Sequence, residues 1–365
     1  MEPTKDKPMR HGFTTGACAT AATKAALTAL IMQESQTEST IYIPAGFDVK
    51  FQLVQCDYTE NEAIVGVIKD GGDDPDATHG ALIQSTVRWR NESGVKIDGG
   101  IGVGRVTKPG LPVPVGEAAI NPVPRQMIGN AVESLLAQYS VERGVEVIIS
   151  VPAGEEIAKK TLNGRLGILG GISILGTRGI VVPFSTSAYM ASIVRAIDVA
   201  YESGCRHVVL STGGRSEKYA MEQYPDLPEE AFVEMGDFVG FSLKQCKRKG
   251  MHKVTLVGMM GKFSKFAQGH MMVHAKGNSV DFNFLADIAR DAGATEEMIE
   301  YILGANTASQ VGDYMESHPA FYEKLCETCC KVGLGAMSGG IEIETFLITL
   351  KGALLGRVTI DDTAN

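Results

Sequence analysis

The chain has no excess of positive charge and no uninterrupted apolar run of membrane-spanning length. Among its 365 residues, 43 Asp and Glu outnumber 34 Lys and Arg, which gives a formal net charge of −9. Nucleic-acid binding requires local positive charge, so nucleic acid is not expected as the main partner. The N-terminal residues also lack the apolar segment of a secretory signal. We therefore expect a cytoplasmic protein whose partner is neither nucleic acid nor a membrane.

The motifs of several common enzyme classes are missing. The stretch Gly258–Ser264 resembles a phosphate-binding loop, but Leu256 stands where the first glycine is needed and Phe263 replaces the magnesium-binding hydroxyl residue. His270 and His274 have the spacing of a zinc-protease pair but lack its glutamate, and the chain contains no Gly-x-Ser-x-Gly elbow. A standard ATP site, a zinc protease and a serine hydrolase are therefore excluded.

The seven cysteines do not suggest a disulfide framework, because their number is odd and no signal peptide is visible. Cys326, Cys329 and Cys330 share one face of an expected helix, but a fourth zinc ligand at a customary spacing is missing. We expect small buried apolar side chains here and no metal site.

The first part of the chain predicts an α+β N-terminal domain, residues 1–140. An alanine-rich helix is expected from Ala17 to about Met32. Residues 41–97 then alternate between apolar and polar side chains, as in Val49, Lys50 and Phe51, which is typical of an antiparallel sheet with one wet face. This domain includes residues 99–125, a stretch with six glycines and five prolines that we interpret as a loop lining an interdomain cleft, with a plain linker as the alternative.

From residue 141 to 335 the pattern predicts a Rossmann-like α/β domain of three layers with a mostly parallel sheet. A helix is expected over 187–203, since apolar residues recur there at helical spacing and Gly204 follows. The C-terminal segment 336–365 is β-rich, and the sequence leaves open whether it joins the sheet of the first or of the second domain. Continuous apolar runs, typical of strands covered on both faces, lie at 145–151, 172–175, 180–182, 208–210 and 254–257.

Two of these runs lead straight into glycine turns, Ser211–Glu217 and Gly258–Ser264. Glycines at the carboxyl end of a buried strand allow the backbone to approach a ligand closely, and open α/β sheets hold nucleotide-like cofactors there. The chain is therefore interpreted as an enzyme with a nucleotide-type cofactor.

Six blocks in order along nearly the whole chain carry a resemblance to a known family: Arg10–Leu27, Lys69–Gly80, Val106–Glu117, Asn121–Arg125, Ser211–Glu217 and His274–Asp281. Together they resemble the cobalt-precorrin-5B C1-methyltransferase family (CbiD) of anaerobic cobalamin biosynthesis. The resemblance implies that S-adenosylmethionine donates a methyl group to C-1 of cobalt-precorrin-5B, a cobalt-bearing tetrapyrrole, giving cobalt-precorrin-6A. Such an in-line displacement needs positioning of donor and acceptor rather than a strong base. Whether the chain forms a homo-oligomer or couples to neighbouring pathway enzymes stays open.

For the methyl donor we predict a site in the turn Ser211–Glu217, with the turn Gly176–Gly179 as the next candidate and tight turns that hold no ligand as the alternative. Glu217 is expected on the ribose hydroxyls or the amino group of the donor. The predicted donor-binding residues are Ser211, Thr212, Gly213, Gly214, Arg215 and Glu217, with Gly176 and Thr177 in the second turn.

For the macrocycle, whose acetate and propionate groups are anionic, we predict basic and hydroxyl residues beside the family blocks. Thr14 or Thr15 is also a candidate helix cap, and the acidic loop around Asp74 has two alternatives, cation binding and simple solvation. The predicted substrate-binding residues are Arg10, Thr14, Thr15, Gly16, Asp73, Asp74, Asp76, Arg178, Lys262 and Lys265, and further basic residues near the blocks are His11, Arg165, Arg215, His270, His274 and Lys276.

Two residues are candidates for proton handling, His274 and Asp281, although Asp281 also stands where it would cap a helix. Two rival functions remain open. One is a non-catalytic tetrapyrrole carrier, which needs basic residues but no donor pocket. The other is a phosphotransferase in which the loop at Gly258–Ser264 has diverged.

Overall fold

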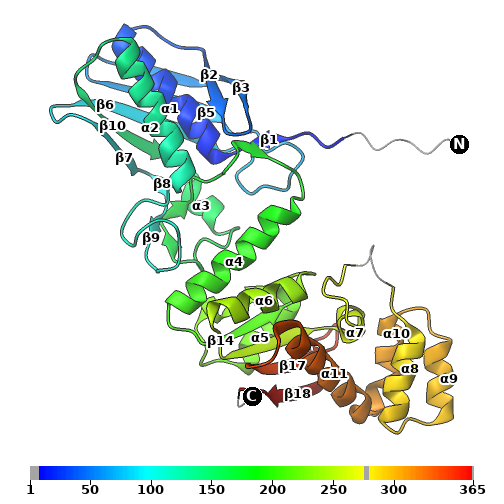
Figure 1. Ribbon diagram of the computed structural model, residues 1–365. Coiled ribbons are helices and arrows are strands. Elements are labelled where there is room, and N and C mark those ends of the chain that lie inside the picture. The colour runs from blue at the N-terminus through cyan, green and yellow to red at the C-terminus, as the bar shows by residue number, and fades with distance from the viewer. Residues whose placement is uncertain (1–7, 275–278, 364–365) are drawn as a thin grey trace, which may run out of the picture. The chain divides into compact units, whose positions relative to one another are not determined.

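The computed structural model describes residues 8–274 and 279–363, and the chain folds as two compact units, Met1–Ser185 and Thr186–Asn365 (Figure 1). It is a mixed α/β protein with several sheets, as predicted. The expected domain boundary at residue 140 is wrong by about 45 residues. The reason is that the strand expected to open the second domain pairs inside the first one.

The first unit is built around helix α1 (Thr15–Met32), which the sequence predicted to within two residues. Thr14 caps it by accepting a hydrogen bond from the Ala17 amide at 3.2 Å. Its small side chains are buried against α2 and strands β2, β5 and β6. The elements of this unit are β1 (Gly12–Phe13), α1, β2 (Glu38–Ile43), β3 (Phe47–Gln52), β4 (Gln55–Tyr58), β5 (Glu62–Ile68), β6 (Leu82–Arg90), β7 (Val95–Gly99), β8 (Gly102–Val103), β9 (Arg105–Val106), α2 (Pro122–Gln138), β10 (Gly144–Ser150), α3 (Gly154–Ala158), β11 (Ile168–Leu169), β12 (Gly171–Ile172) and β13 (Ile180–Val181).

The main sheet of this unit has the order β4-β5-β6-β10-β7 and is antiparallel except for the parallel pair β10–β7. Strand β10 was expected in the second domain, but it lies between β6 and β7. The alternation predicted for the hairpin β2–β3 holds, since Val49 and Phe51 are buried while Lys50 is exposed. The runs at 172–175 and 180–182, expected as strands of the second domain's sheet, form only the two-residue strands β12 and β13 of the first unit.

The glycine- and proline-rich stretch 99–125 is not structureless. It contains β8 and β9, which pair with β12 and β11, and its last residues begin helix α2. Pro122 stands in the first turn of α2, where its missing N–H costs no helical hydrogen bond. This stretch is therefore an integral part of the first unit, while its role beside a cleft stays a prediction.

Helix α1 is, among the described residues, the one helix long and apolar enough to cross a membrane by length and composition. In the structure 78% of that window is buried inside the protein. Its apolar character is therefore accounted for by its place in the core of the first unit.

The second unit contains a five-stranded sheet with the order β15-β14-β16-β17-β18. The first four strands are parallel and β18 is antiparallel to β17, so the C-terminal segment belongs to this sheet. The elements are α4 (Thr186–Glu202), β14 (His207–Ser211), α5 (Gly214–Gln223), η1 (Glu229–Ala231), β15 (Phe232–Glu234), α6 (Val239–Lys249), β16 (Lys253–Gly258), α7 (Met260–Ala267), α8 (Phe282–Asp291), α9 (Glu296–Leu303), α10 (Ala308–Tyr314), η2 (Met315–Ser317), α11 (Pro319–Met337), β17 (Glu342–Ile348) and β18 (Leu354–Asp361).

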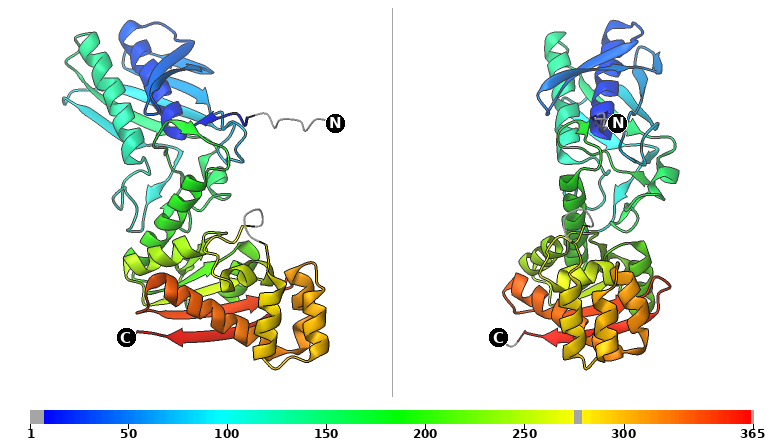
Figure 2. Two further views of the ribbon diagram at one scale, coloured as in Figure 1. Left: turned by 45° about the vertical axis from the view of Figure 1, so that its right-hand side comes forward. Right: turned by 90° about the vertical axis from the view of Figure 1, so that its right-hand side faces the viewer.

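Helices cover both faces of this sheet. Tyr224, which directly follows α5, contacts Glu344 on β17, whereas Cys330 of α11 contacts the adjacent residue Thr345. Because successive side chains of a strand point to opposite faces, α5 and α11 lie on opposite sides. Figure 2 shows α11 lying along β17 and β18. The chain continues from β14 into α5 on one face of the sheet, and from β16 into α7 on the face that α11 covers. The topological switch point therefore lies between β14 and β16.

The three clustered cysteines of α11 are buried, as expected for small apolar side chains. Cys326, Cys329 and Cys330 are each 0% exposed, and all seven cysteines are free. Burial raises the pKa of the Cys330 thiol to about 11, so it stays protonated near neutral pH. The side chain packs against β17 through Thr345.

Candidate functional site

The predicted donor turn lies at the carboxyl end of β14, beside the end of β16. Ser211 is the cross-strand partner of Val257, and the Thr212 amide donates to the Val257 carbonyl at 3.2 Å. Lys262 of α7 donates to the Thr212 carbonyl at 2.8 Å and lies 3.1 Å from Asp237 Oδ1. The two glycine turns predicted from the sequence are therefore adjacent, and they meet at the switch point of the sheet.

The glycines of this edge face open space. Apart from the neighbouring residues and the backbone of their own helix, no described atom lies within 4 Å of the position that a Cβ would take at Gly213, Gly214 or Gly261. Packing against the protein therefore does not explain these glycines. The first turn of α5 also presents unpaired backbone N–H groups, which suit a polar ligand.

A buried hydroxyl group stands at the same place. Ser211 is 1% exposed, and its Oγ has no hydrogen-bond partner among the described residues. A buried polar atom without a partner is costly, so it is satisfied when a ligand or an ordered water lies beside it. The predicted residue Thr212 follows Ser211, and its hydroxyl oxygen lies 3.4 Å from that of Ser216, which was not predicted.

Carboxylates gather around this edge, and sequence reasoning missed most of them. Burial raises the pKa of the Tyr189 phenol to about 12, and three carboxylates add to the shift, those of Glu234, Asp237 and Glu217. Only Glu217 was predicted. The signal that was available is the position of Glu234 and Asp237 directly after an apolar segment, Phe232 and Val233, which follows the glycine turn by one helix.

The other predicted donor turn, at Gly176 and Thr177, belongs to the first unit and has a structural explanation. A Cβ at Gly176 would lie 2.5 Å from the Thr14 side chain, and φ of Gly176 is +122°. The Gly16 amide donates to the Leu175 carbonyl at 3.1 Å, and Thr15 Oγ1 accepts from the Leu175 amide at 2.9 Å. These contacts hold the loop against the start of α1, so donor binding by Gly176 and Thr177 stays a prediction.

Arg10 forms an ion pair and a hydrogen bond with the acidic loop of the first unit. The Arg10 guanidinium pairs with Asp70, and its amide donates to Asp73 Oδ2 at 2.6 Å. Asp74 accepts from the Phe184 amide at 2.8 Å. The predicted roles of Arg10, Asp73 and Asp74 in substrate binding therefore stay predictions, because each residue already has a partner in the fold.

Asp76 is the partner of a buried lysine. Lys69 is 1% exposed and its Nζ lies 2.5 Å from Asp76 Oδ2. Burial pushes the pKa of Asp76 up, but hydrogen bonds from Lys69 and Thr78 outweigh this and hold it below its ordinary value. The carboxylates of the acidic loop thus have partners within the first unit, and the role of Asp76 in substrate binding stays a prediction. The described residues contain no group of three His, Cys, Asp or Glu side chains that fits a metal ion.

The candidates for proton handling are not brought together by a described contact. Asp281 caps α8 by accepting hydrogen bonds from the amides of Asn283 and Phe284 at 2.8 and 3.3 Å, which is the alternative that the sequence left open. Lys265 is buried and its Nζ lies 3.5 Å from the His274 carbonyl. Lys276 lies outside the described residues, as does part of the block that contains it.

The remaining predicted basic residues are mostly on the surface. Arg178 and Arg215 are exposed, as are His11 and His274, while Arg165 and His270 are half-buried. Exposed guanidinium groups suit carboxylate binding, since they are already charged and reach into solvent. A shared anion site formed by them stays a prediction.

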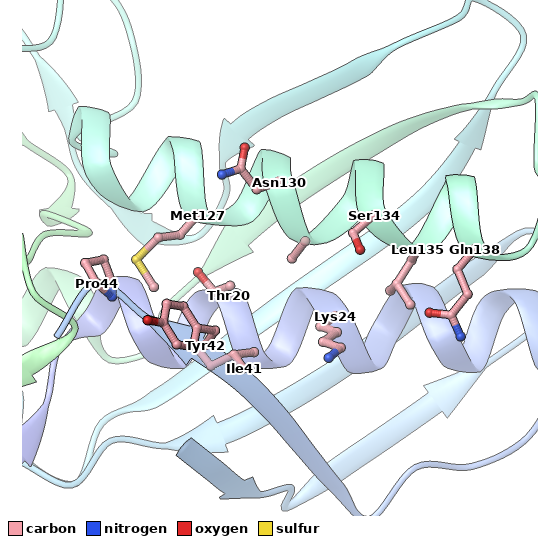
Figure 3. Close-up of a pocket in the computed structure, with 11 residues that line it drawn as sticks. Thr20, Lys24, Ile41, Tyr42, Pro44, Met127, Asn130, Ser134, Leu135 and Gln138 are labelled. Carbon is pink, nitrogen blue, oxygen red and sulfur yellow. The ribbon is translucent and has the colours of Figure 1, made fainter. Parts of the chain in front are cut away.

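A groove of about 380 Å³ lies in the first unit between α1, α2 and β2 (Figure 3). Tyr42 and Met127 stand at one end of it, and Lys24 lies on its floor with its Nζ 2.7 Å from the Thr40 carbonyl. No predicted site residue is among the residues that line this groove. It therefore adds no support to the predicted sites.

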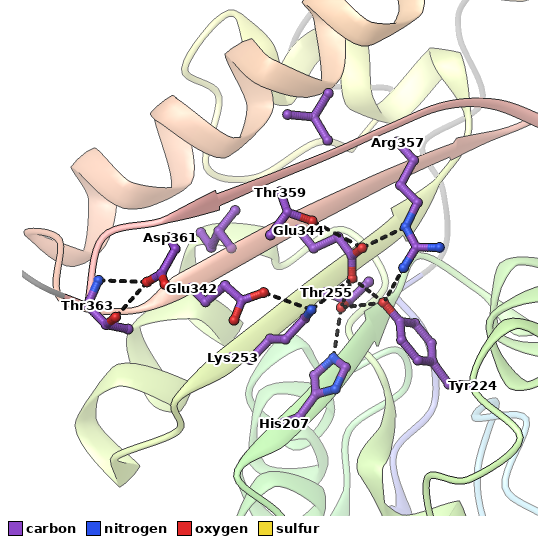
Figure 4. A network of polar contacts seen from close by, with 12 residues as sticks. His207, Tyr224, Lys253, Thr255, Glu342, Glu344, Arg357, Thr359, Asp361 and Thr363 are labelled. Carbon is purple, nitrogen blue, oxygen red and sulfur yellow. Dashed lines mark hydrogen bonds and ion pairs between the residues drawn. The ribbon is translucent and has the colours of Figure 1, made fainter.

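A polar network crosses the second sheet on the α5 side (Figure 4). The Glu344 carboxylate, 2% exposed, accepts from Tyr224 and Arg357, and Thr255 Oγ1 lies 2.9 Å from it. Arg357 also lies over the Phe346 ring at 4.2 Å. This network joins α5 to three strands, so it supports the helix whose first turn forms the glycine site.

Comparison with known proteins gives a consistent result over nearly the whole chain. The CbiD family model matches residues 2–183, and the model of the CbiD C-terminal domain matches residues 272–359. A cobalt-precorrin-5B C(1)-methyltransferase of Priestia megaterium is 65% identical over 357 residues, which cover 97% of each chain. That of Thermus thermophilus is 49% identical over 84% of this chain and 81% of its own.

A solved structure is also similar. The crystal structure of a cobalamin biosynthesis protein (CbiD) from Archaeoglobus fulgidus is 28% identical, with a TM-score of 0.39, and the match covers 78% of this chain and 85% of that chain. The sequence matches carry the assignment. The chain belongs to the CbiD family.

Proposed function

We propose that this chain transfers a methyl group from S-adenosylmethionine to C-1 of cobalt-precorrin-5B, giving cobalt-precorrin-6A. The observation that carries the proposal is the 65% identity, over 97% of both chains, to a relative named cobalt-precorrin-5B C(1)-methyltransferase. Because the similarity extends over nearly the full length of both chains, it supports the same reaction for this protein. A cytoplasmic location, expected from the sequence, is part of the proposal.

The main task of the protein in this reaction is to position the methyl donor and the acceptor carbon. The electron pair of the ring carbon forms the new C–C bond while the S–CH₃ bond breaks and its electrons stay on sulfur. Alignment of the two reactants about 3–3.5 Å apart removes most of the entropic barrier. This requirement fits a site made of glycine turns and hydroxyl groups, in which no strong base is needed.

The donor site in this proposal is the glycine edge of the second unit. S-adenosylmethionine fits it on three grounds: the open space at Gly213 and Gly214, the buried Ser211 hydroxyl without a described partner, and the surrounding carboxylates. Negative charge favours the sulfonium and the amino group of the donor. In this interpretation the second unit is a Rossmann-like domain, with the ligand at the switch point of its sheet.

The macrocycle is assigned to basic and hydroxyl residues. Arg178 offers an exposed guanidinium group. Thr14, Thr15 and Gly16 at the start of α1 are buried and hydrogen-bonded to Ala17 and Leu175, so a contact with the macrocycle requires these residues to give up those partners. Lys262 already binds Asp237, and Arg10 already binds Asp70. To contact the substrate, each basic side chain must bind a substrate carboxylate in addition to its protein partner.

The test is a methyl-transfer assay with purified protein, cobalt-precorrin-5B and S-adenosylmethionine carrying a ¹³C-labelled methyl group. We expect a product whose mass increases by one labelled methyl group, with the ¹³C signal at C-1. A protein that binds the macrocycle but forms no labelled product would be a carrier. Labelling at another ring carbon would also contradict the proposal.

A phosphotransferase is disfavoured by the loop after β16. A Cβ at Gly258 would lie 2.6 Å from the Phe263 ring, so this ring fills the place beside the turn. Lys262, the residue that would reach a phosphate, is held by the Thr212 carbonyl and Asp237. Saturable ATP binding without S-adenosylmethionine binding would overturn this interpretation.

A further inference from the structure

Glu234 occupies a distinctive place beside the glycine edge. It ends β15, and in the parallel pairing of β14 and β15 it is the direct partner of Ser211. Cross-strand partners point to the same face of a sheet, so the Glu234 and Ser211 side chains share one face. One of them is an exposed carboxylate, and the other is a buried hydroxyl without a described partner.

The connection between these two strands has the form used for adenosine-containing cofactors. Strand β14 runs into Gly213 and Gly214, helix α5 follows, and β15 ends in an acidic residue 21 positions after Gly213. In dinucleotide-binding folds an acidic residue about 20 positions after the glycine turn accepts hydrogen bonds from ribose hydroxyls. The glycines are needed so that the backbone can approach the ligand, and here their Cβ positions are open.

The neighbouring carboxylates are less exposed than that of Glu234. Asp237 lies 3.1 Å from Lys262 Nζ, and this ion pair links it to the turn after β16. Glu217 lies in the first turn of α5 and is 9% exposed. Glu234 is the exposed acidic side chain at the end of a sheet strand, where a vicinal diol can be bound by both carboxylate oxygens.

We propose that Glu234 binds the ribose hydroxyls of the methyl donor, the role for which the sequence pointed to Glu217. This inference rests on the proposed function. A diol offers two O–H donors and a carboxylate offers two acceptors, so the pair selects a ribonucleoside over its deoxy form. Glu234 is a positioning residue: it fixes the adenosyl group so that the sulfonium methyl points toward the acceptor carbon.

The test is equilibrium binding of S-adenosylhomocysteine and of its 2′-deoxy and 3′-deoxy analogues, measured by calorimetry. Glu234→Gln is the test variant, and Glu222→Gln is the matched control, because Glu222 is exposed near the other end of α5. Losing a hydrogen bond to a charged group weakens binding by about 10- to 100-fold. We expect this loss for S-adenosylhomocysteine with Glu234→Gln and no change with Glu222→Gln.

The analogues separate ribose recognition from a general electrostatic effect. The wild-type protein should bind at least one deoxy analogue about 10- to 100-fold more weakly than S-adenosylhomocysteine. Glu234→Gln should bind that analogue and S-adenosylhomocysteine with nearly equal affinity. An equal loss for all ligands, or no loss, would overturn the role of Glu234. The wild-type comparison of ribose and deoxy ligands stays decisive if the variant does not fold.

Failure of the proposed function gives a different result. In that case the wild-type protein binds no S-adenosylhomocysteine at all, and both proposals fall. Binding by the wild-type protein with unchanged affinity in Glu234→Gln overturns only the assignment of Glu234.

Discussion

The ammonium nitrogen of Lys262 lies 2.8 Å from the carbonyl oxygen of Thr212, so a side chain of α7 fastens the turn that follows β14. The same nitrogen lies 3.1 Å from Asp237, which follows β15. Three segments that follow three adjacent strands are thus joined by one side chain. This connection fixes the edge of the sheet at which we place the methyl donor.

Replacing Lys262 by methionine should weaken donor binding with little effect on folding. The apolar length of the side chain is kept, but the link between the turns is lost, so the turn must be ordered by the ligand itself. We expect about a 10-fold rise in the Kd for S-adenosylhomocysteine and a loss of less than about 1 kcal/mol in the free energy of unfolding, since the side chain is partly exposed. Calorimetry and urea unfolding measure the two quantities. Lys244→Met, at an exposed position of α6, is the control and should change neither.

Adding a side chain at Gly214 should abolish donor binding while the protein stays folded. Gly214 begins α5, and a Cβ added there meets no atom beyond the neighbouring backbone. It would instead occupy the space assigned to the ligand. Gly335→Val is the matched control, because Gly335 is also a helix residue of the second unit with an open Cβ position. Equal donor affinity in the two variants would contradict the site.

A side chain at Gly12 should lower stability, in contrast to one at Gly214, because tight packing is the reason for a glycine at this position. A Cβ there would lie 2.1 Å from the carbonyl carbon of Gly71, and backbone atoms cannot move aside cheaply. We expect Gly12→Ala to lower the free energy of unfolding by about 2 to 3 kcal/mol, measured by denaturant titration. An unchanged midpoint would show that the loop at Gly71 is not packed as the structure describes.

The sequence was sufficient for elements with strong local signals, and insufficient where pairing is distant. The alanine-rich pattern and a capping threonine specify α1, and glycine after an apolar run marks the end of β14. No local feature of Val145–Val151 reveals that it pairs with β6 and β7, because a buried strand looks alike in either sheet. For the same reason Glu234 and Tyr189 were missed: their relation to Ser211 and Glu217 comes from strand pairing and helix packing.

Glu344→Gln should destabilise the second unit more than the same change at Glu342. Both residues lie on one face of β17, but the Glu344 side chain is 2% exposed and the Glu342 side chain 29%. Glutamine keeps one acceptor oxygen but places an NH₂ donor where the other oxygen stood, so either the Arg357 guanidinium or the Tyr224 hydroxyl loses its acceptor, and Arg357 loses its counter-charge. We expect a loss of about 3 kcal/mol for Glu344→Gln and less than about 1 kcal/mol for Glu342→Gln in denaturant unfolding. Equal losses would mean that the network in Figure 4 does not carry stability.

His207 should make the free energy of unfolding depend on pH. Burial, followed by the nearby charge of Lys253, lowers the pKa of His207 to about 4, and its Nε2 lies 2.8 Å from Thr255 Oγ1. In the unfolded chain the pKa is about 6.5, so the unfolded state takes up a proton first as the pH falls. The stabilisation is complete above about pH 6.5 and is lost as the pH falls toward 4. His207→Gln should flatten the dependence of the unfolding free energy on pH over this window, as measured by denaturant unfolding at a series of pH values. An unchanged dependence on pH would contradict this role of His207.

Substitutions at Asp281 can distinguish a helix-capping role from a catalytic role of this residue. Its carboxylate accepts hydrogen bonds from the Asn283 and Phe284 amides at the start of α8. Asparagine can make the same cap but cannot accept a proton as a base, whereas alanine can do neither. We expect Asp281→Asn to keep both the methyl-transfer rate and the unfolding free energy, and Asp281→Ala to lose about 1 kcal/mol of stability. If Asp281 handles a proton, the asparagine variant stays folded but loses activity, and a pH–rate profile of the two proteins would show the missing group.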